Sequence, residues 1–203
     1  MLILDPRFRW GDGGALGTNS QTVVAFVVMP TALSVSPPDL ALREAFWAML
    51  DDYAAHDPAE GEFFSRARPD FAAYVQSLND EEQGINIPEG WVPCSHRWLL
   101  TESRDVAGTV RVRHNILLPY LAEEGGHIGY DVAPTFRGRG YAVQCLQAGL
   151  AVARTLGLTR VLVCADTDNP ASWKTIEKCG GVLEREFYSN RFKCQVRRYW
   201  IEL

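Results

Sequence analysis

One seven-residue segment combines the residue types that bind an anion at the start of a helix. Residues 136–142 read FRGRGYA and separate a strand-like apolar run from a helix-like one. Because glycine has no Cβ, Gly138 and Gly140 let a ligand approach backbone N–H groups that lack an intrahelical acceptor. The positive end of the helix and the charges of Arg137 and Arg139 favour an anion there. The segment predicts an anion-binding turn; a tight turn with exposed arginines is the simpler alternative.

Two common nucleotide-binding motifs do not fit this chain. The sequence contains no G-x-x-x-x-G-K-[ST] segment, so nothing in it supports ATP hydrolysis by a P-loop. The N-terminal GDGGALG matches a dinucleotide fingerprint only in part, because Leu16 stands at the third glycine position and no clear strand precedes it.

Two motifs in order resemble those of the GNAT superfamily of acetyltransferases. Arg137-x-x-Gly140-x-Ala142, after the strand IGYDV, is similar to the family's R/Q-x-x-G-x-G/A motif, and residues 169–180, NPASWKTIEKCG, resemble its N-x-x-A-x-x-x-Y-E-K-x-G segment. The resemblance covers about residues 100–203 and is most like a bacterial subgroup of predicted acetyltransferases. Residues 29–99 agree only in the placement of helices.

The resemblance implies a fold and a co-substrate, acetyl-CoA. The fold would be α/β (α+β): one domain with a mixed, mostly antiparallel sheet, flanking helices and a V-shaped gap between the strands that hold Tyr130 and Val163. In this family, free backbone groups of the first splayed strand bind the pantetheine arm, and the helix start binds the pyrophosphate. The residues implied to bind the co-substrate are Tyr130, Asp131, Val132, Arg137, Gly138, Arg139, Gly140, Tyr141, Ala142, Asn169 and Ser172.

The reaction implied by the resemblance is direct attack of a neutral primary amine on the acetyl thioester. This attack needs a base that takes a proton from the ammonium form of the amine. Asp131 lies in the strand expected to pass the thioester and is our first choice, with Glu124 and His127 next. Backbone N–H groups of the splayed strand would polarise the thioester carbonyl.

The sequence does not point to one general acid. Many family members have a tyrosine that protonates the departing thiolate, but here Ile176 stands at that position and has no proton to donate. Tyr188 and Tyr130 are candidates by residue type alone, and solvent or the substrate's own proton is the alternative. The isoleucine also leaves open a coenzyme A-binding sensor or interaction module without catalysis. A small α/β protein that binds another phosphate ligand is a further alternative.

Composition limits the partners of the protein. The chain has 203 residues, 47% of them apolar, with a net charge of −5 and a pI near 5.4, which does not favour nucleic acid as a partner. No apolar run reaches the roughly 18–20 residues that span a bilayer. The five cysteines are scattered and lack zinc-site spacing, so we expect reduced thiols, a cytoplasmic protein and no metal. The expected partner is a small-molecule or peptide amine, and a homodimer stays open.

The elements expected to position these residues form one domain over residues 29–203. Residues 1–28 form an irregular extension with a short strand at 22–28 as an option, and Met29 is an alternative start. An acidic loop with Asp57, Glu60 and Glu62 serves either solvation or substrate steering. The expected order is a helix from Asp39 to about 56–58, a helix at 71–78, strands at 97–102, 106–114 and 126–132, the helix Gly138–Leu156, a strand at 160–166, a helix at 169–179, and strands at 182–188 and 195–203.

Overall fold

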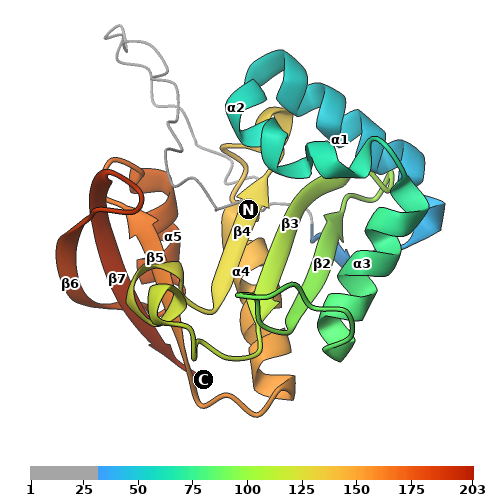
Figure 1. Cartoon of the computed structure of the whole chain (residues 1–203). Coiled ribbons are helices and arrows are strands. Elements are labelled where there is room, and N and C mark those ends of the chain that lie inside the picture. Colours follow the sequence, from blue (N-terminus) through green and yellow to red (C-terminus); the bar gives the residue numbers. More distant parts are fainter. Residues whose placement is uncertain (1–31) are drawn as a thin grey trace, which may run out of the picture.

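The structure, a computed structural model, describes residues 32–203 (Figure 1). The expected extension, its strand and the alternative start at Met29 lie outside the described residues. The helices are α1 (Arg43–His56), α2 (Pro58–Gly61), α3 (Phe71–Gln83), α4 (Tyr141–Thr155) and α5 (Pro170–Lys178). The strands are β1 (Ser34–Ser36), β2 (Cys94–Leu100), β3 (Val106–Arg113), β4 (Ile128–Val132), β5 (Arg160–Asp166), β6 (Val182–Ser189) and β7 (Cys194–Glu202).

The strands form two antiparallel sheets whose edges face each other. The first has the order β1-β2-β3-β4 and the second β5-β7-β6, so that β4 and β5 are the facing edges (Figure 1). Within the described residues, the backbone joins them at one place: the His127 N–H donates to the Leu162 carbonyl over 2.7 Å. Beyond this point the two strands separate. The expected gap between the strands of Tyr130 and Val163 is confirmed.

Helices cover both faces of the first sheet. Helices α1 and α3 lie on one face and α4 on the other (Figure 1). The alternation along β2 follows these two layers, because Trp98 packs with the aromatic side chains of α1 and α3, whereas Leu99 belongs to the aliphatic core beneath α4. The expected apolar stripe of the first helix is confirmed, since all its members are buried: Leu42, Phe46, Leu50 and Tyr53.

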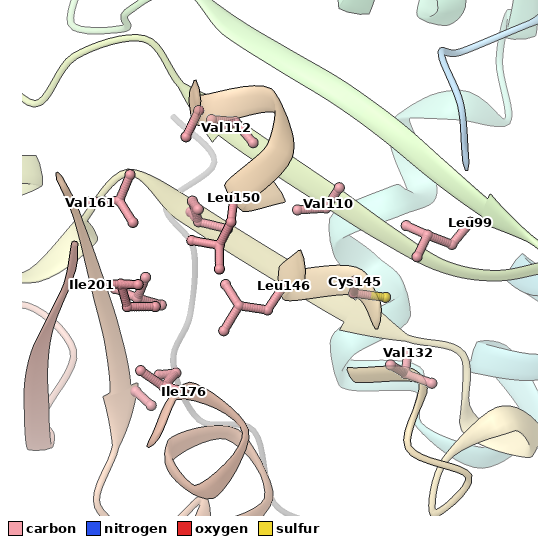
Figure 2. Close-up of a cluster of buried hydrophobic side chains, with 14 of the residues drawn as sticks. Leu99, Val110, Val112, Val132, Cys145, Leu146, Leu150, Val161, Ile176 and Ile201 are labelled. Carbon is pink, nitrogen blue, oxygen red and sulfur yellow. The ribbon is translucent and has the colours of Figure 1, made fainter. Parts of the chain in front are cut away.

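The aliphatic core joins the two sheets. Figure 2 shows Leu146 and Leu150 of α4 between Val110 of the first sheet and Val161 and Ile201 of the second. Helix α4 therefore holds the two sheets together behind the gap, through burial of apolar side chains. Its N-terminus lies beside the gap as a result.

The structure differs from the sequence expectation in a few elements. Helix α4 begins at Tyr141 rather than Gly138, because Gly138 and Gly140 have φ of +75° and +78°, outside the helical region. The acidic loop is helical, as α2 followed by a 3-10 turn over Glu62–Ala67. Helix α3 continues to Gln83, and β1 was not expected. None of the described helices has the length and apolar character needed to span a membrane.

Candidate active site

The closed end of the gap depends on one glycine and one histidine. Besides the backbone bond to Leu162, the His127 ring accepts the Leu162 N–H at Nδ1 over 2.9 Å. Burial and the nearby Arg113 lower the pKa of His127 to about 4, so its ring is neutral near pH 7. Gly126 has φ of +64°, and a Cβ there would lie 2.6 Å from the Leu162 carbonyl oxygen. His127, a reserve candidate for the base, therefore has a structural role at this junction.

The open part of the gap is a cavity of about 170 Å³. Strand β4 contributes one wall, and β5 and the start of α5 contribute the other. The cavity brings together several residues expected from the sequence: Glu124, Tyr130, Asp131, Val132, Ala142, Asn169 and Ser172. The expected residues of the turn before α4 do not line it, apart from Ala142 at the helix start.

The backbone of β4 presents unpaired groups to this cavity. Hydrogen bonds from Arg113 N–H to the His127 carbonyl and from Ala133 N–H to the Ala107 carbonyl show that odd-numbered residues of this segment bond to β3, apart from the His127 N–H that donates to Leu162. Because successive residues of a strand point their backbone groups in opposite directions, those of Ile128 and Tyr130 face the gap. An extended ligand with amide groups can bond to this edge as an added strand would.

The turn before α4 is shaped to leave helix N–H groups open. Gly140 is the N-cap of α4, and no side chain of residues 32–203 caps the helix. A Cβ added at Gly138 would meet no atom within 4 Å, so the space around it is open. The first N–H groups of a helix lack intrahelical acceptors and attract anions. The segment can therefore bind a phosphate group through its backbone.

Arg137 has protein partners on this turn. Its Nε donates to the Val132 carbonyl over 3.0 Å, and its guanidinium pairs with Asp57 at 2.8 Å. The Arg139 guanidinium donates to the Thr135 carbonyl over 2.9 Å. Both arginines thus stabilise the turn, and Arg137 also joins it to the start of α2.

The start of α5 closes the other side of the cavity. The Asn169 side chain accepts the Ser172 N–H over 3.0 Å and caps the helix. Tyr130 reaches across the gap from β4, with its hydroxyl 3.0 Å from the Ser172 hydroxyl. The pKa of Tyr130 is raised, mainly because the side chain is buried, so the phenol stays protonated at neutral pH.

Asp131, the expected base, lies in a buried ion pair. Its carboxylate is 2.5 Å from an Arg111 guanidinium nitrogen and accepts the Thr109 hydroxyl over 3.2 Å. The side chains of Asp131 and Arg111 are only 9% and 8% exposed. Burial opposes the charge on Arg111, but the carboxylate outweighs it and raises the pKa of the guanidinium. The Asp131 carboxylate is therefore already engaged by two side chains of β3.

Glu60 is a second carboxylate in this cavity, and the sequence did not single it out as catalytic. It lies on α2 and lines the cavity together with Asp131. Burial and then the negative charge of Asp131 raise the pKa of Glu60 to about 8, against an opposing effect of Arg111. A carboxyl group with a pKa near neutrality is suited to proton transfer. The available signal was the acidic loop, but nothing local distinguished Glu60 from Glu62.

The other predicted catalytic residues have different surroundings. Glu124 lines the cavity and accepts a hydrogen bond from the Ser189 hydroxyl. Tyr188 is 51% exposed on β6 and lines neither cavity described here, so its position gives the general-acid prediction no support. Ile176 is fully buried in the aliphatic core (Figure 2).

A second cavity, of about 310 Å³, adjoins the first. The two share part of their walls, formed by Arg111, Arg113, Gly125 and Phe192. Arg111 and Arg113 alternate along β3 with Val110 and Val112, which face α4. The alternation was visible in the sequence, whereas the burial of both arginines was not.

The second cavity also contains a cluster of groups that can bind metals. Glu81, Cys94 and His96 present ligand atoms within 4.8 Å of one another, with Glu81 and His96 paired at 2.8 Å. Burial disfavours the charged imidazole, but Cys94 and Glu81 outweigh it and raise the pKa of His96. Several arginines line the same cavity, which disfavours a cation. The expectation that no residue binds a metal stays a prediction.

Comparisons with known proteins agree with this geometry. The family model for the acetyltransferase (GNAT) domain matches residues 40–182. No curated protein sequence matches the chain. One similar solved structure is RimL, a ribosomal L7/L12 alpha-N-protein acetyltransferase in complex with coenzyme A, with a TM-score of 0.63 and 17% identity over 86% of this chain and 96% of that one.

Two further solved structures have the same fold. The microcin C7 self-immunity acetyltransferase MccE, in complex with acetyl-CoA and AMP, has a TM-score of 0.61 and 16% identity over 85% of this chain and 93% of that one. A chimera of the spermidine N-acetyltransferase SpeG from Vibrio cholerae has a TM-score of 0.56 and 17% identity over 85% of this chain and 96% of that one. At such identities these structures show the fold alone. Because the family model matches most of the chain, including the gap and the turn before α4, the protein belongs to the GNAT acetyltransferases.

Proposed function

We propose that the protein transfers an acetyl group from acetyl-CoA to a primary amine by direct attack. The observation that carries this proposal is the junction between β4 and β5 at His127 and Leu162, beyond which the two sheet edges open into a cavity. Unpaired backbone groups, an uncapped helix N-terminus and two carboxylates meet around that cavity. These are the groups needed to hold an extended thioester and to activate an amine.

The proposed binding mode uses mainly the backbone. N–H groups of residues 138–142 bind the pyrophosphate at the start of α4, where side-chain capping is absent. The pantetheine arm lies along β4 and bonds to backbone groups that face the gap, among them those of Tyr130. Asn169 and Ser172 form the opposite side of the cavity.

In the proposed reaction Glu60 accepts a proton from the ammonium group of the acceptor. The amine nitrogen then forms a bond to the thioester carbon, while the bond from that carbon to sulfur breaks. Backbone N–H groups of β4 stabilise the negative charge that develops on the carbonyl oxygen. As the C–S bond breaks, the nitrogen loses its second proton to solvent and the departing thiolate takes a proton from solvent, since Ile176 is buried and has none to give.

Glu60 and Asp131 have separate roles in this proposal. Asp131 was the first choice for the base, but its carboxylate is already engaged by Arg111 and Thr109. Its negative charge helps to raise the pKa of Glu60 to about 8, after the larger effect of burial. We therefore assign proton transfer to Glu60. The charges of Asp131 and Arg111 adjust its pKa, which Asp131 raises and Arg111 lowers. The role of Glu124 stays a prediction.

The wider setting of the protein also stays a prediction. A small-molecule or peptide amine is the proposed acceptor, with no nucleic acid or membrane as partner and a cytoplasmic location. A homodimer stays open.

The function is tested by two measurements on the wild-type chain. Acetyl-CoA should raise the melting temperature, because a ligand that binds the folded state stabilises it. A panel of primary amines should release free coenzyme A, detected with a thiol reagent. Acetyl-CoA binding without thiol release would favour the sensor alternative. Absence of any shift in the melting temperature would contradict the proposed co-substrate.

A further inference from the structure

The wall between the two cavities contains a buried positive charge that lacks an acidic partner. Arg113 is 9% exposed, and its guanidinium donates to the carbonyls of Gly125 and Gly126 over 3.2 and 3.1 Å. Within residues 32–203, the ion pairs of the structure include none with Arg113. Burial lowers the pKa of Arg113, consistent with a charge that the protein itself compensates poorly.

Cys94 and Tyr120 of the second cavity favour the charge of Arg113, but burial outweighs them, and no carboxylate of the described residues pairs with it. Glu81 pairs with His96 at 2.8 Å and lies 3.7 Å from Arg66, and Glu89 is exposed at the rim. Arg111 is paired with Asp131 on the side of the first cavity. The Nε atom of Arg66 is buried without an acceptor. The second cavity therefore has more cationic than anionic groups and is suited to a negatively charged ligand group.

The remaining walls of the second cavity are largely aromatic. Phe63, Trp91, Tyr120 and Phe192 line it. Such side chains favour an apolar or aromatic body in the ligand. Because the two cavities share wall residues, a molecule in the second cavity lies next to the cavity that contains Glu60.

We propose that the acceptor is an amine that also carries a carboxylate and an apolar body, and that Arg113 binds its carboxylate. This inference rests on the proposed acetyl transfer and names the substrate class of that site. A buried bond between a guanidinium and a carboxylate is charge-assisted and strong. Polyamines, which have no anionic group, would meet an electropositive wall instead.

The inference is tested with matched amines that differ only in the carboxylate, phenylalanine and 2-phenylethylamine, with spermidine as a cationic comparison. We expect a kcat/KM about tenfold or more higher for phenylalanine, as a charge-assisted hydrogen bond predicts. In Arg113→Gln the preference should be lost, because the amide can still donate to a glycine carbonyl but has no charge. Arg154→Met, an exposed residue of α4 that lines neither cavity, should keep the preference.

Binding of the acetylated products separates failure of this inference from failure of the proposed function. Calorimetry with coenzyme A present should show tighter binding of N-acetylphenylalanine than of N-acetyl-2-phenylethylamine, whether or not the chain turns over. Circular dichroism and thermal melting check that Arg113→Gln folds; should it unfold, the wild-type comparison alone decides. Equal or weaker binding of the carboxylate, preference for spermidine, or an unchanged preference in a folded Arg113→Gln would each overturn the proposal.

Discussion

The two cavities of this protein are lined by different parts of the chain. The gap between β4 and β5 presents backbone groups and the open start of α4, and glycines shape its turn and its closed end. The second cavity presents side chains, namely arginines and aromatic rings from elements far apart in the sequence. A co-substrate shared by a whole family suits the first kind of site, because backbone groups do not vary with sequence. A specific acceptor suits the second.

The largest effect should come from a negative charge at the start of α4. Gly140→Asp should lower the affinity for acetyl-CoA roughly 100-fold or more, because it repels the pyrophosphate where charge-assisted hydrogen bonds form. Gly140→Ala is the matched control: it shares the strain of a side chain at φ +78° but adds no charge. Calorimetry on both folded variants measures the difference. Equal affinities of the two variants would show that the pyrophosphate does not lie here.

Removal of the proposed base should have the next largest effect. Glu60→Gln should lower kcat about 100-fold and remove the limb near pH 8 from the pH–rate profile, since the amide cannot take the proton. Glu62→Gln, an exposed neighbour, should leave the profile unchanged. Should Asp131→Asn remove the limb while Glu60→Gln retains it, Asp131 would be the base instead.

The same residue predicts a pH dependence of stability. The pKa of Glu60 is raised in the folded state to about 8, so the folded protein holds a proton that the unfolded chain releases at lower pH. The melting temperature of the wild type should therefore fall as the pH rises from the range in which free carboxyl groups titrate to about 8. Glu60→Gln should lose less over this window. Parallel curves for the two proteins would contradict the raised pKa.

A change at the closed end of the gap should cost stability and distort the first cavity. Gly126→Ala should lower the free energy of unfolding by about 2 kcal/mol, because the residue has φ +64° and ψ −176°, a region open almost only to glycine. Its Cβ would also lie 2.6 Å from the Leu162 carbonyl oxygen. Gly90→Ala is the control, with φ +80° and no atom within 4 Å of the added Cβ. Denaturant unfolding compares the two, and an equal loss would mean that the junction tolerates the methyl group.

The smallest effect should follow from loss of an arginine on the turn. Arg137→Ala should weaken acetyl-CoA binding by about threefold, the scale of a partly exposed ion pair, since Arg137 already pairs with Asp57. Asp57→Asn should give a similar loss if Arg137 acts by holding the turn. Tighter binding in Asp57→Asn would show instead that the arginine contacts the pyrophosphate directly.

Local chemistry made part of this protein predictable from the sequence. Two closely spaced glycines before an apolar stripe indicated a turn with an open helix start, and Gly138 and Gly140 do have left-handed φ. Strand β5 was expected at its observed bounds, because a short run of β-branched and apolar residues is typical of a buried strand. These features depend on neighbours in the chain, which a sequence shows directly.

Tertiary packing decided the electrostatics of the site. Glu60 of α2 and Asp131 of β4 line one cavity only because the chain folds, and burial and then the charge of Asp131 raise the pKa of Glu60 to about 8. Arg113 reads as an ordinary polar residue of a strand, yet the fold encloses it without an acidic partner among the described residues. Burial and charge at a point depend on segments tens of residues apart. The motifs could therefore indicate the proposed acetyl-CoA site, whereas the proposed base and the proposed acceptor pocket depend on the folded chain.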